Sequence, residues 1–330
     1  MNKLLLSAAV LLLAANAASA AFRAESVAGT RENETTFGLA LDATLLEGHA
    51  KEHVFSPKSE SADYAAELGI PDDGRRHTIS RLDWDMASVG LVGLKGSARR
   101  GAFSLNLGGW IGSGGDSDME DYDWLAGDDL PYTEYSRSDA ESTLAWMLDA
   151  NVSADFFRND AFRAAAFLGF RVQHWEWECD GLNDYCYSDF DYKWVQEEGH
   201  VCDYEQEIRF AYLGLEGAWT FAPDWDLSGY FFWAPAYEGE DNDEHYAAEK
   251  TFKDTFAYDG GHVFGAGLEV AWHATERATL ALAFDWQKAS LHEGDYRQDD
   301  YGEGEWLEAE DAAGIENEYA AATLSFRYAF

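Results

Sequence analysis

One stretch of this chain alternates apolar and polar side chains for longer than an ordinary strand needs. Between residues 143 and 156 the even-numbered positions are apolar and most of the odd-numbered ones are polar. The apolar set is Leu144, Trp146, Leu148, Ala150, Val152, Ala154 and Phe156, and the polar set is Thr143, Asp149, Asn151, Ser153 and Asp155. Successive side chains of a strand point to opposite faces, so this segment predicts a strand that crosses a bilayer with an apolar outside and a polar inside.

Segments of the same kind recur to the C-terminus, and we count ten of them. Short turns such as 158–160 and 222–224 alternate with long polar connections such as 52–76, 113–140 and 237–258. An even strand number with this asymmetry is typical of bacterial outer-membrane barrels. The predicted fold class is therefore all-β: a ten-stranded antiparallel transmembrane β-barrel with long extracellular loops. A soluble β-sandwich is the alternative, but it has no need of membrane-length strands with a polar second face.

Particular residues follow from this interpretation. The first strand is expected at Phe37–Leu46, which leaves Glu52 in a loop, and the last at Tyr319–Phe330, whose terminal Phe resembles an outer-membrane assembly signal. Aromatic residues gather at both interfaces of membrane barrels. The candidates for these girdles are Trp110, Trp146, Trp286 and Tyr328.

The N-terminus predicts export. Lys3 precedes an apolar run from Leu4 to about Ala15, and Ala18-Ser19-Ala20 is a small-residue cleavage site. We divide the chain into a signal peptide, residues 1–20, and a single barrel domain, residues 21–330. The formal net charge of −39 favours cationic partners and excludes nucleic acid as one.

Three cysteines, Cys179, Cys186 and Cys202, lie close together in the sequence. In an oxidising compartment the expectation is one disulfide and one free thiol, with the pairing left open. His200 beside them permits a Cys3His zinc site as the alternative.

Two acidic motifs carry the chemistry. In an extended strand, Asp241, Asp243 and His245 project to one side, and a carboxylate beside an imidazole raises its basicity and fixes its tautomer. Asp121 and Asp123 repeat the spacing upstream. We predict that the two motifs meet across one cleft, with His245 as general base. The alternative is two solvated loops of a very acidic protein.

The chain resembles the omptins, a family of outer-membrane endopeptidases that includes surface plasminogen activators. The resemblance rests on residues 81–85, 121–124, 136–137, 212–215, 241–246 and 314–317, and the run Asp-Asn-Asp-Glu-His-Tyr at 241–246 carries most of it. It implies that Asp121, Asp123, Asp243 and His245 are catalytic, with His245 activating a water and no covalent intermediate. It also implies cleavage between two basic residues. The implied subsite residues are Glu52 and Asp241 before the cut and Glu134 after it, where the family often has Asp.

One departure concerns lipid. Omptins need lipopolysaccharide, which the family binds partly through an alternating Tyr, Glu and Arg on one strand. The matching residues here are Phe170, Val172 and His174, and the facing basic residue is Glu207. An acidic or apolar set does not hold phosphates. Lipid binding then uses other groups, such as Arg171 or Arg209, or activity does not depend on it in the same way.

The sequence thus predicts an outer-membrane endopeptidase with its active site facing outward, acting on basic peptides or proteins as a monomer. We expect no metal and no cofactor, with lipopolysaccharide a doubtful activator and outer-membrane lipid a surrounding partner. The rival interpretations are a catalytically silent adhesin or invasin, and a narrow channel or calcium-binding surface protein.

Overall fold

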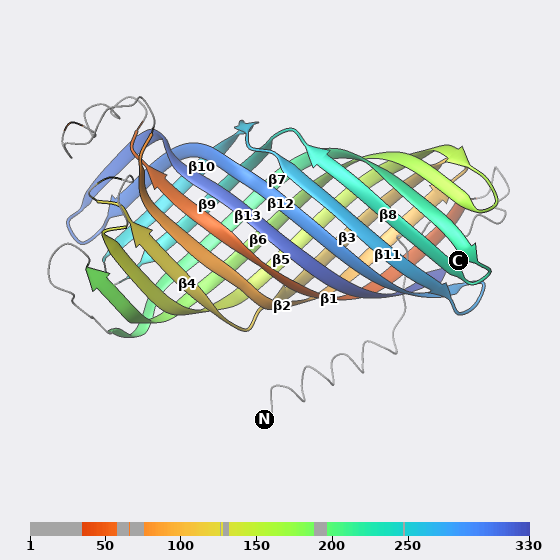
Figure 1. Ribbon diagram of the computed structural model, residues 1–330, viewed down its shortest axis with the longest axis horizontal. Helices are drawn as coiled ribbons and strands as arrows, with labels where there is room; N and C mark the ends of the chain where they lie inside the picture. The colour runs from red at the N-terminus through yellow and green to blue at the C-terminus, as the bar shows by residue number, and fades with distance from the viewer. Residues whose placement is uncertain are drawn as a thin grey trace.

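The computed structural model describes residues 35–57, 66, 76–125, 127, 132–187, 197–246 and 248–330, with the side chains of 182–187 and 197–198 left aside. The predicted signal peptide lies outside these residues. The described chain is all-β and antiparallel (Figure 1). Its strands are β1 (Thr35–Phe55), β2 (Thr78–Arg100), β3 (Phe103–Ser113), β4 (Asp116–Asp123), β5 (Glu134–Arg158), β6 (Phe162–Tyr187), β7 (Glu197–Ala222), β8 (Trp225–Ala234), β9 (Tyr237–His245), β10 (Lys250–Gly260), β11 (Val263–His273), β12 (Ala278–Asp300) and β13 (Glu305–Ala329).

The sheet closes because β1 pairs with both β2 and β13. The predicted all-β barrel is confirmed, but the number of strands differs from the predicted ten, since the described residues form thirteen. The number differs because three lengths of the barrel wall each consist of two strands separated by two residues, namely β3 and β4, β8 and β9, and β10 and β11. The breaks contain Gly114, Pro235 and Gly261, and the last has a φ of +62°. Proline lacks an amide donor and glycine accepts this φ, so the ladder is interrupted without the barrel opening.

An apolar belt surrounds the lower part of the barrel. On β5, Leu148, Val152 and Phe156 are exposed, whereas Asp149 and Asn151 are buried in the lumen. This confirms the predicted pattern of an apolar outside and a polar inside. Among the described residues, no helix is long and apolar enough to cross a membrane.

Two of the residues predicted for the aromatic girdles lie on opposite faces of the barrel wall. Trp286 is on the outside, where its indole N–H donates to Glu318 across 2.9 Å. Trp110 points into the lumen instead and donates to Asp42 across 3.1 Å, so its place in the girdle is corrected. The lumen holds a buried carboxylate that needs this donor, and the alternation of β3 places Trp110 on that side.

The largest correction concerns the long connections. Glu52 lies in β1, the Asp121/Asp123 motif in β4, and the Asp241–His245 motif in β9, so all three predicted loop positions are strands. The strands continue well beyond the apolar belt, and only their outward face changes from apolar to charged. On β2, for example, Leu82 and Trp84 remain buried while Asp83 and Asp85 face out.

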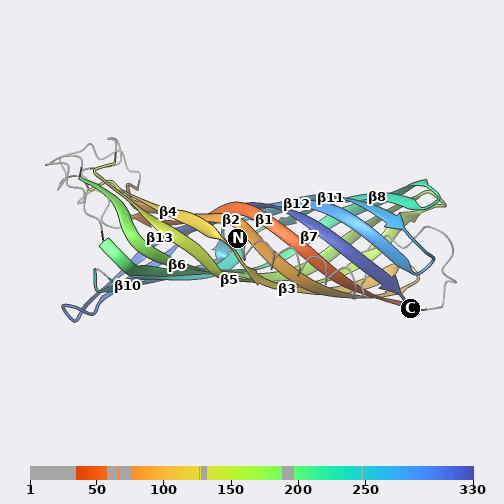
Figure 2. The ribbon, with the colours of Figure 1, turned by 90° about the horizontal axis from the view of Figure 1, so that it is seen from below.

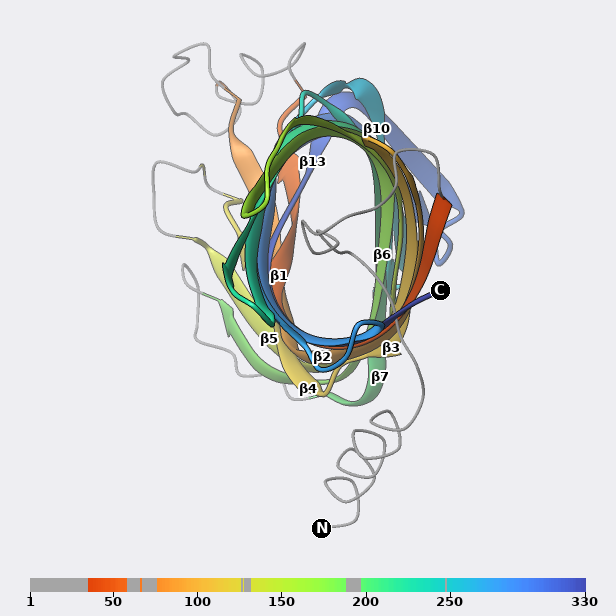
Figure 3. The same cartoon turned by 90° about the vertical axis from the view of Figure 1, so that its right-hand side faces the viewer.

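Above the belt the barrel has its own core. Trp84 stacks on Tyr204 with ring centroids 4.6 Å apart, and Trp177 packs against both. The Cys179–Cys202 disulfide joins β6 and β7 beside this cluster. The barrel is wide in one view, slimmer in the view turned by a quarter (Figure 2), and oval when seen along its axis (Figure 3). Two walls of the upper lumen therefore face each other at short range.

Candidate active site

One side of the mouth is formed by β9, whose inward positions are Asp241, Asp243 and His245. Asp241 and Asp243 are buried, at 5% and 1% exposure, and Glu240 and Glu244 point away from the lumen. His245 Nε2 lies 2.6 Å from Asp243 Oδ2. Phe252 of β10 packs edge-on against the imidazole, with centroids 5.3 Å apart. The period of the strand thus places an oriented imidazole at the rim, as predicted.

The other side is β4, which carries Asp121 and Asp123. Ser80 of β2 donates its hydroxyl to Asp121 Oδ1 across 3.2 Å, which holds that carboxyl in place. Both aspartates interact electrostatically with His245 on the opposite wall. The two sequence motifs, which are more than a hundred residues apart, therefore meet across one mouth.

Protons are bound tightly in this group. Burial, and then the charge of Asp123, raises the pKa of Asp121 to about 8. Burial also raises the pKa of Asp123 to about 6, against the hydrogen bond from Ser80. Burial by itself lowers the pKa of His245, but the charge and hydrogen bond of Asp243, with help from Asp121 and Asp123, outweigh it and raise that pKa to about 9. One proton shared by the two aspartates and one on the imidazole are the natural state near neutral pH.

A cluster of buried carboxylates adjoins this catalytic group. Glu52 of β1 is 1% exposed, and burial followed by the charges of Asp243 and Asp241 raises its pKa. Burial and the charges of Asp254 and Asp243 likewise raise the pKa of Asp241. The two acids predicted to receive the residue before the cut are therefore in one electrostatic group.

The sequence interpretation missed Asp254. It lies in β10 directly opposite Asp241 of β9 and is 1% exposed. Its signal is the alternation of Phe252, Asp254 and Phe256, which falls within the long polar connection predicted at 237–258. Three inward positions in register with β9 were enough to indicate a strand.

Glu134, predicted to receive the residue after the cut, is at the start of β5. It is buried and paired in register with Asp123 of β4. Its charge contributes to the raised pKa of Asp123. The structure therefore brings all seven predicted site residues to the same mouth, on four different strands.

The residues that match the family's lipid-binding positions lie on the outside. His174 of β6 stacks on Trp146 and sits between two acids, with Nε2 2.8 Å from Glu176 and Nδ1 3.5 Å from Glu207. Arg209, proposed above as a substitute, is outside too but pairs with Glu207, Glu238 and Glu240.

The expectation that Arg171 could bind lipid instead is wrong. It points into the lumen, where its Nε lies 2.8 Å from Asp149 and its Nη1 donates to Gln287. The strand alternation of β6 puts it on the opposite face from His174, so it cannot reach lipid.

The disulfide also excludes the Cys3His zinc site that was considered as an alternative. Cys179 and Cys202 are bonded to each other, and His200 lies 2.9 Å from Asp203 instead. These sulfurs are therefore not thiolate ligands. Among the described residues, no group of three or more His, Cys, Asp or Glu is arranged to hold a metal ion.

A closed antiparallel barrel with an apolar belt, a polar lumen and an acidic mouth defines a bacterial outer-membrane protein. Sequence comparisons agree. The chain is 28% identical over 284 residues to the plasminogen activator of Yersinia pestis, covering 84% of this chain and 87% of that protein. It is 24% identical over 302 residues to the outer membrane protease OmpP of Escherichia coli strain K12, covering 86% and 87%.

The family follows from a longer match. The family model described as "Omptin family" matches residues 33–330, so the chain belongs to the omptin family of outer-membrane proteases. The crystal structure of the outer membrane protease OmpT from Escherichia coli has the same fold, with a TM-score of 0.78 and 22% identity over 92% of this chain and 100% of that one. The protein lies in the outer membrane with its acidic mouth on the extracellular side.

Proposed function

We propose that this outer-membrane protease cuts basic peptides and proteins between paired basic residues, using a water activated by His245. The observation that carries the proposal is the meeting of the His245–Asp243 pair with Asp121 and Asp123 across the mouth. The arrangement contains a base, an orienting carboxylate and a second carboxyl pair, which is what an attack by water without a covalent intermediate requires.

In this mechanism His245 takes a proton from a water that lies between the two walls. Asp243, at 2.6 Å, fixes the tautomer and stabilises the imidazolium that forms. Asp121 and Asp123 share one proton, because their proximity disfavours double ionisation. The protonated carboxyl of the pair donates a hydrogen bond to the oxyanion of the peptide carbonyl as the water attacks. The imidazolium of His245 then gives its proton to the peptide nitrogen as the C–N bond breaks and the amine leaves.

The subsites follow from the surrounding acids. Glu52 and Asp241 bind the side chain before the scissile bond, and Glu134 binds the side chain after it. Two carboxylates suit the planar fork of donors on a guanidinium. Glu134 lies beside Asp123 at the rim, so the two side chains of a basic pair would enter on opposite sides of the catalytic group.

The test uses refolded protein and a quenched peptide with a single Arg-Arg pair, with and without lipopolysaccharide. The His245→Ala variant is compared with His262→Ala, which removes an exposed imidazole outside the mouth. Cleavage between the arginines that persists in His262→Ala and disappears in His245→Ala is expected.

Two other results carry information. Folded wild-type protein that cuts nothing under either condition would indicate the silent adhesin instead. Equal rates with and without lipopolysaccharide would mean that cleavage does not depend on this lipid, in agreement with the departure from the family at Phe170, Val172 and His174. We expect the protein to act as a monomer, which analytical ultracentrifugation in detergent checks.

A further inference from the structure

Asp254 is a buried carboxylate that neither the catalytic group nor the two predicted pocket acids account for. Its Oδ1 accepts the backbone N–H of Arg297 across 3.1 Å, while Oδ2 is buried and has no hydrogen-bond partner. Leaving a buried carboxylate oxygen without a donor is costly. This oxygen is therefore available to a ligand that brings a donor.

Its surroundings give the sign of that group. Glu52, Asp241 and Asp243 face the same space, and each also has a buried carboxylate oxygen without a hydrogen-bond partner. Within the described residues, no Lys or Arg side chain forms an ion pair with Glu52, Asp241 or Asp254. Four buried acceptors without a hydrogen-bond partner around one space favour a cationic ligand with several N–H donors.

We propose that Asp254 is a third carboxylate of the pocket for the side chain preceding the scissile bond, and that it makes the pocket select a guanidinium. This inference rests on the proposed function. Asp241 and Asp254 lie side by side on β9 and β10, whereas Glu52 comes from β1. Arginine offers five donors on the edges of one plane and can bridge acids on different strands, whereas the ammonium of lysine offers three donors from one point.

Several buried carboxyl groups close together cannot all be ionised without a cation, so some of them hold protons when no substrate is bound. Burial, with a smaller contribution from the charge of Asp243, raises the pKa of Asp254 to about 8, against the hydrogen bond from the backbone of Arg297. The groups that face it are Glu52 of β1, Asp241 and Asp243 of β9, and Tyr296 of β12. A bound guanidinium would take the place of the proton, so binding of an arginine substrate strengthens as the pH rises.

The test compares Asp254→Asn with Glu240→Gln in the full-length refolded protein. Asparagine keeps an oxygen for the backbone N–H of Arg297, and Glu240 is an outward acid next to Asp241, so each variant replaces one carboxyl by an amide near the same place. Each is given three peptides that differ only before the cut, where they carry arginine, lysine or citrulline, the neutral isostere of arginine.

In Asp254→Asn, kcat/KM for the arginine peptide should fall by about tenfold to a hundredfold, mainly through KM. The citrulline peptide should be cut equally well or better, and the advantage of arginine over lysine should shrink. Glu240→Gln should stay within about twofold of wild type for all three peptides, because its charge is exposed and screened. Asp254→Glu should restore part of the preference for arginine.

The proposal is overturned if folded Asp254→Asn has the same ratio of kcat/KM for the arginine peptide to kcat/KM for the citrulline peptide as the wild type. A lower thermal stability together with that unchanged ratio would indicate a purely structural role for Asp254. If Asp254→Asn fails to refold, Asp254→Ser is measured against the same ratio. Failure of the proposed function looks different, because the wild type itself would then leave the arginine peptide uncut.

Discussion

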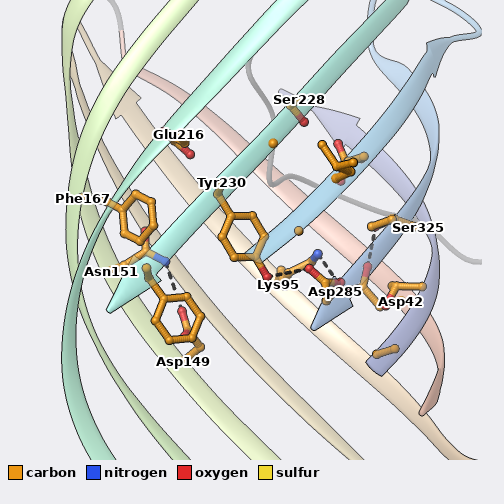
Figure 4. Close-up of a pocket in the computed structure, with 18 of the residues that line it drawn as sticks. Asp42, Lys95, Asp149, Asn151, Phe167, Glu216, Ser228, Tyr230, Asp285 and Ser325 are labelled. Carbon is orange, nitrogen blue, oxygen red and sulfur yellow. Dashed lines mark hydrogen bonds and ion pairs between the residues drawn. The ribbon is translucent and has the colours of Figure 1, made fainter. Parts of the chain in front are cut away.

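The lumen has two halves that bury carboxylates in opposite ways. Inside the apolar belt the acids are paired: Asp42 with Lys95 at 2.8 Å, Asp149 with Arg171 at 2.8 Å, and Asp155 with Arg163 at 2.6 Å. These residues line or adjoin a cavity of about 190 Å³, and in Figure 4 Tyr230 points at Asp285 and Ser325 at Asp42. At the mouth, Glu52, Asp241 and Asp254 are as deeply buried, but no Lys or Arg in the described part of the chain forms an ion pair with them.

This difference separates structure from function. A buried charge that is neutralised within the chain fixes the shape of the lumen and needs nothing from outside. A buried carboxylate without a counterion is unfavourable, and a cationic ligand that pairs with it removes this cost. The mouth is therefore the part of the lumen that favours binding of a cation. The negative charge of the whole chain would not reveal this, since both halves contain many acids.

The largest effect should come from removing one catalytic carboxyl. Asp121→Asn deletes the shared proton and is expected to lower kcat by about a thousandfold, within the range for general acid–base groups. Its stability should not fall, because one of two repelling buried acids is gone. Asp118→Asn, on the outward face of the same strand and paired there with Arg137, serves as the control and should keep its activity. A fully active Asp121→Asn would remove the second wall from the mechanism.

The next prediction reverses the pattern in the lower lumen. Asp149→Asn leaves Arg171 buried without its anion and takes an acceptor from Tyr212. The free energy of unfolding should fall by about 3 kcal/mol, since breaking a buried pair leaves an uncompensated charge. Urea titration of the barrel in detergent measures this, while kcat for the Arg-Arg peptide should stay within about twofold. Loss of activity without loss of stability would mean that the carboxylates of the lower lumen also take part in function.

The sequence predicted one half of this contrast better than the other. The alternation on β5 was enough to predict which side chains enter the lumen, because a lipid-facing strand must be apolar on one side. Above the belt the outward face is charged, so strands such as β9 and β10 looked like acidic loops, and Asp254 was missed. Asp243 and His245 were predictable because they are local, two residues apart. The meeting of the two motifs was predicted from their repeated spacing and from the family resemblance, because no local pattern shows that β4 faces β9, which depends on the closure and flattening of the whole barrel.

The pH dependence of kcat/KM gives a smaller effect and tests the mouth alone. Activity needs neutral His245, whose raised pKa of about 9 makes the neutral fraction grow as the pH rises towards 9. It also needs one proton on the aspartate pair, and the pKa of Asp121, about 8, makes that proton scarcer above 8. The profile should therefore be bell-shaped with its maximum between about 8 and 9.

The Asp243→Asn variant sharpens this prediction. It removes the charge that contributes most to the raised pKa of His245, so the rising limb should move to lower pH while the maximum rate falls. A limb that stays in place would assign it to a group other than His245. In contrast, Asp149→Asn should leave the whole profile unchanged, because its charge lies in the lower lumen.

The smallest expected effect is that of salt on substrate capture. The outward acids of the upper barrel, such as Asp85 and Glu244, add a field that attracts a cationic peptide, and salt screens it within a Debye length of about 10 Å at 0.1 M. For the Arg-Arg peptide, kcat/KM should fall by about threefold to tenfold between low and high salt. The matched citrulline peptide, which carries less charge, should lose less. A rate for the arginine peptide that ignores salt would mean that the outward acids do not steer substrate, and that only the buried acids of the mouth recognise the cation.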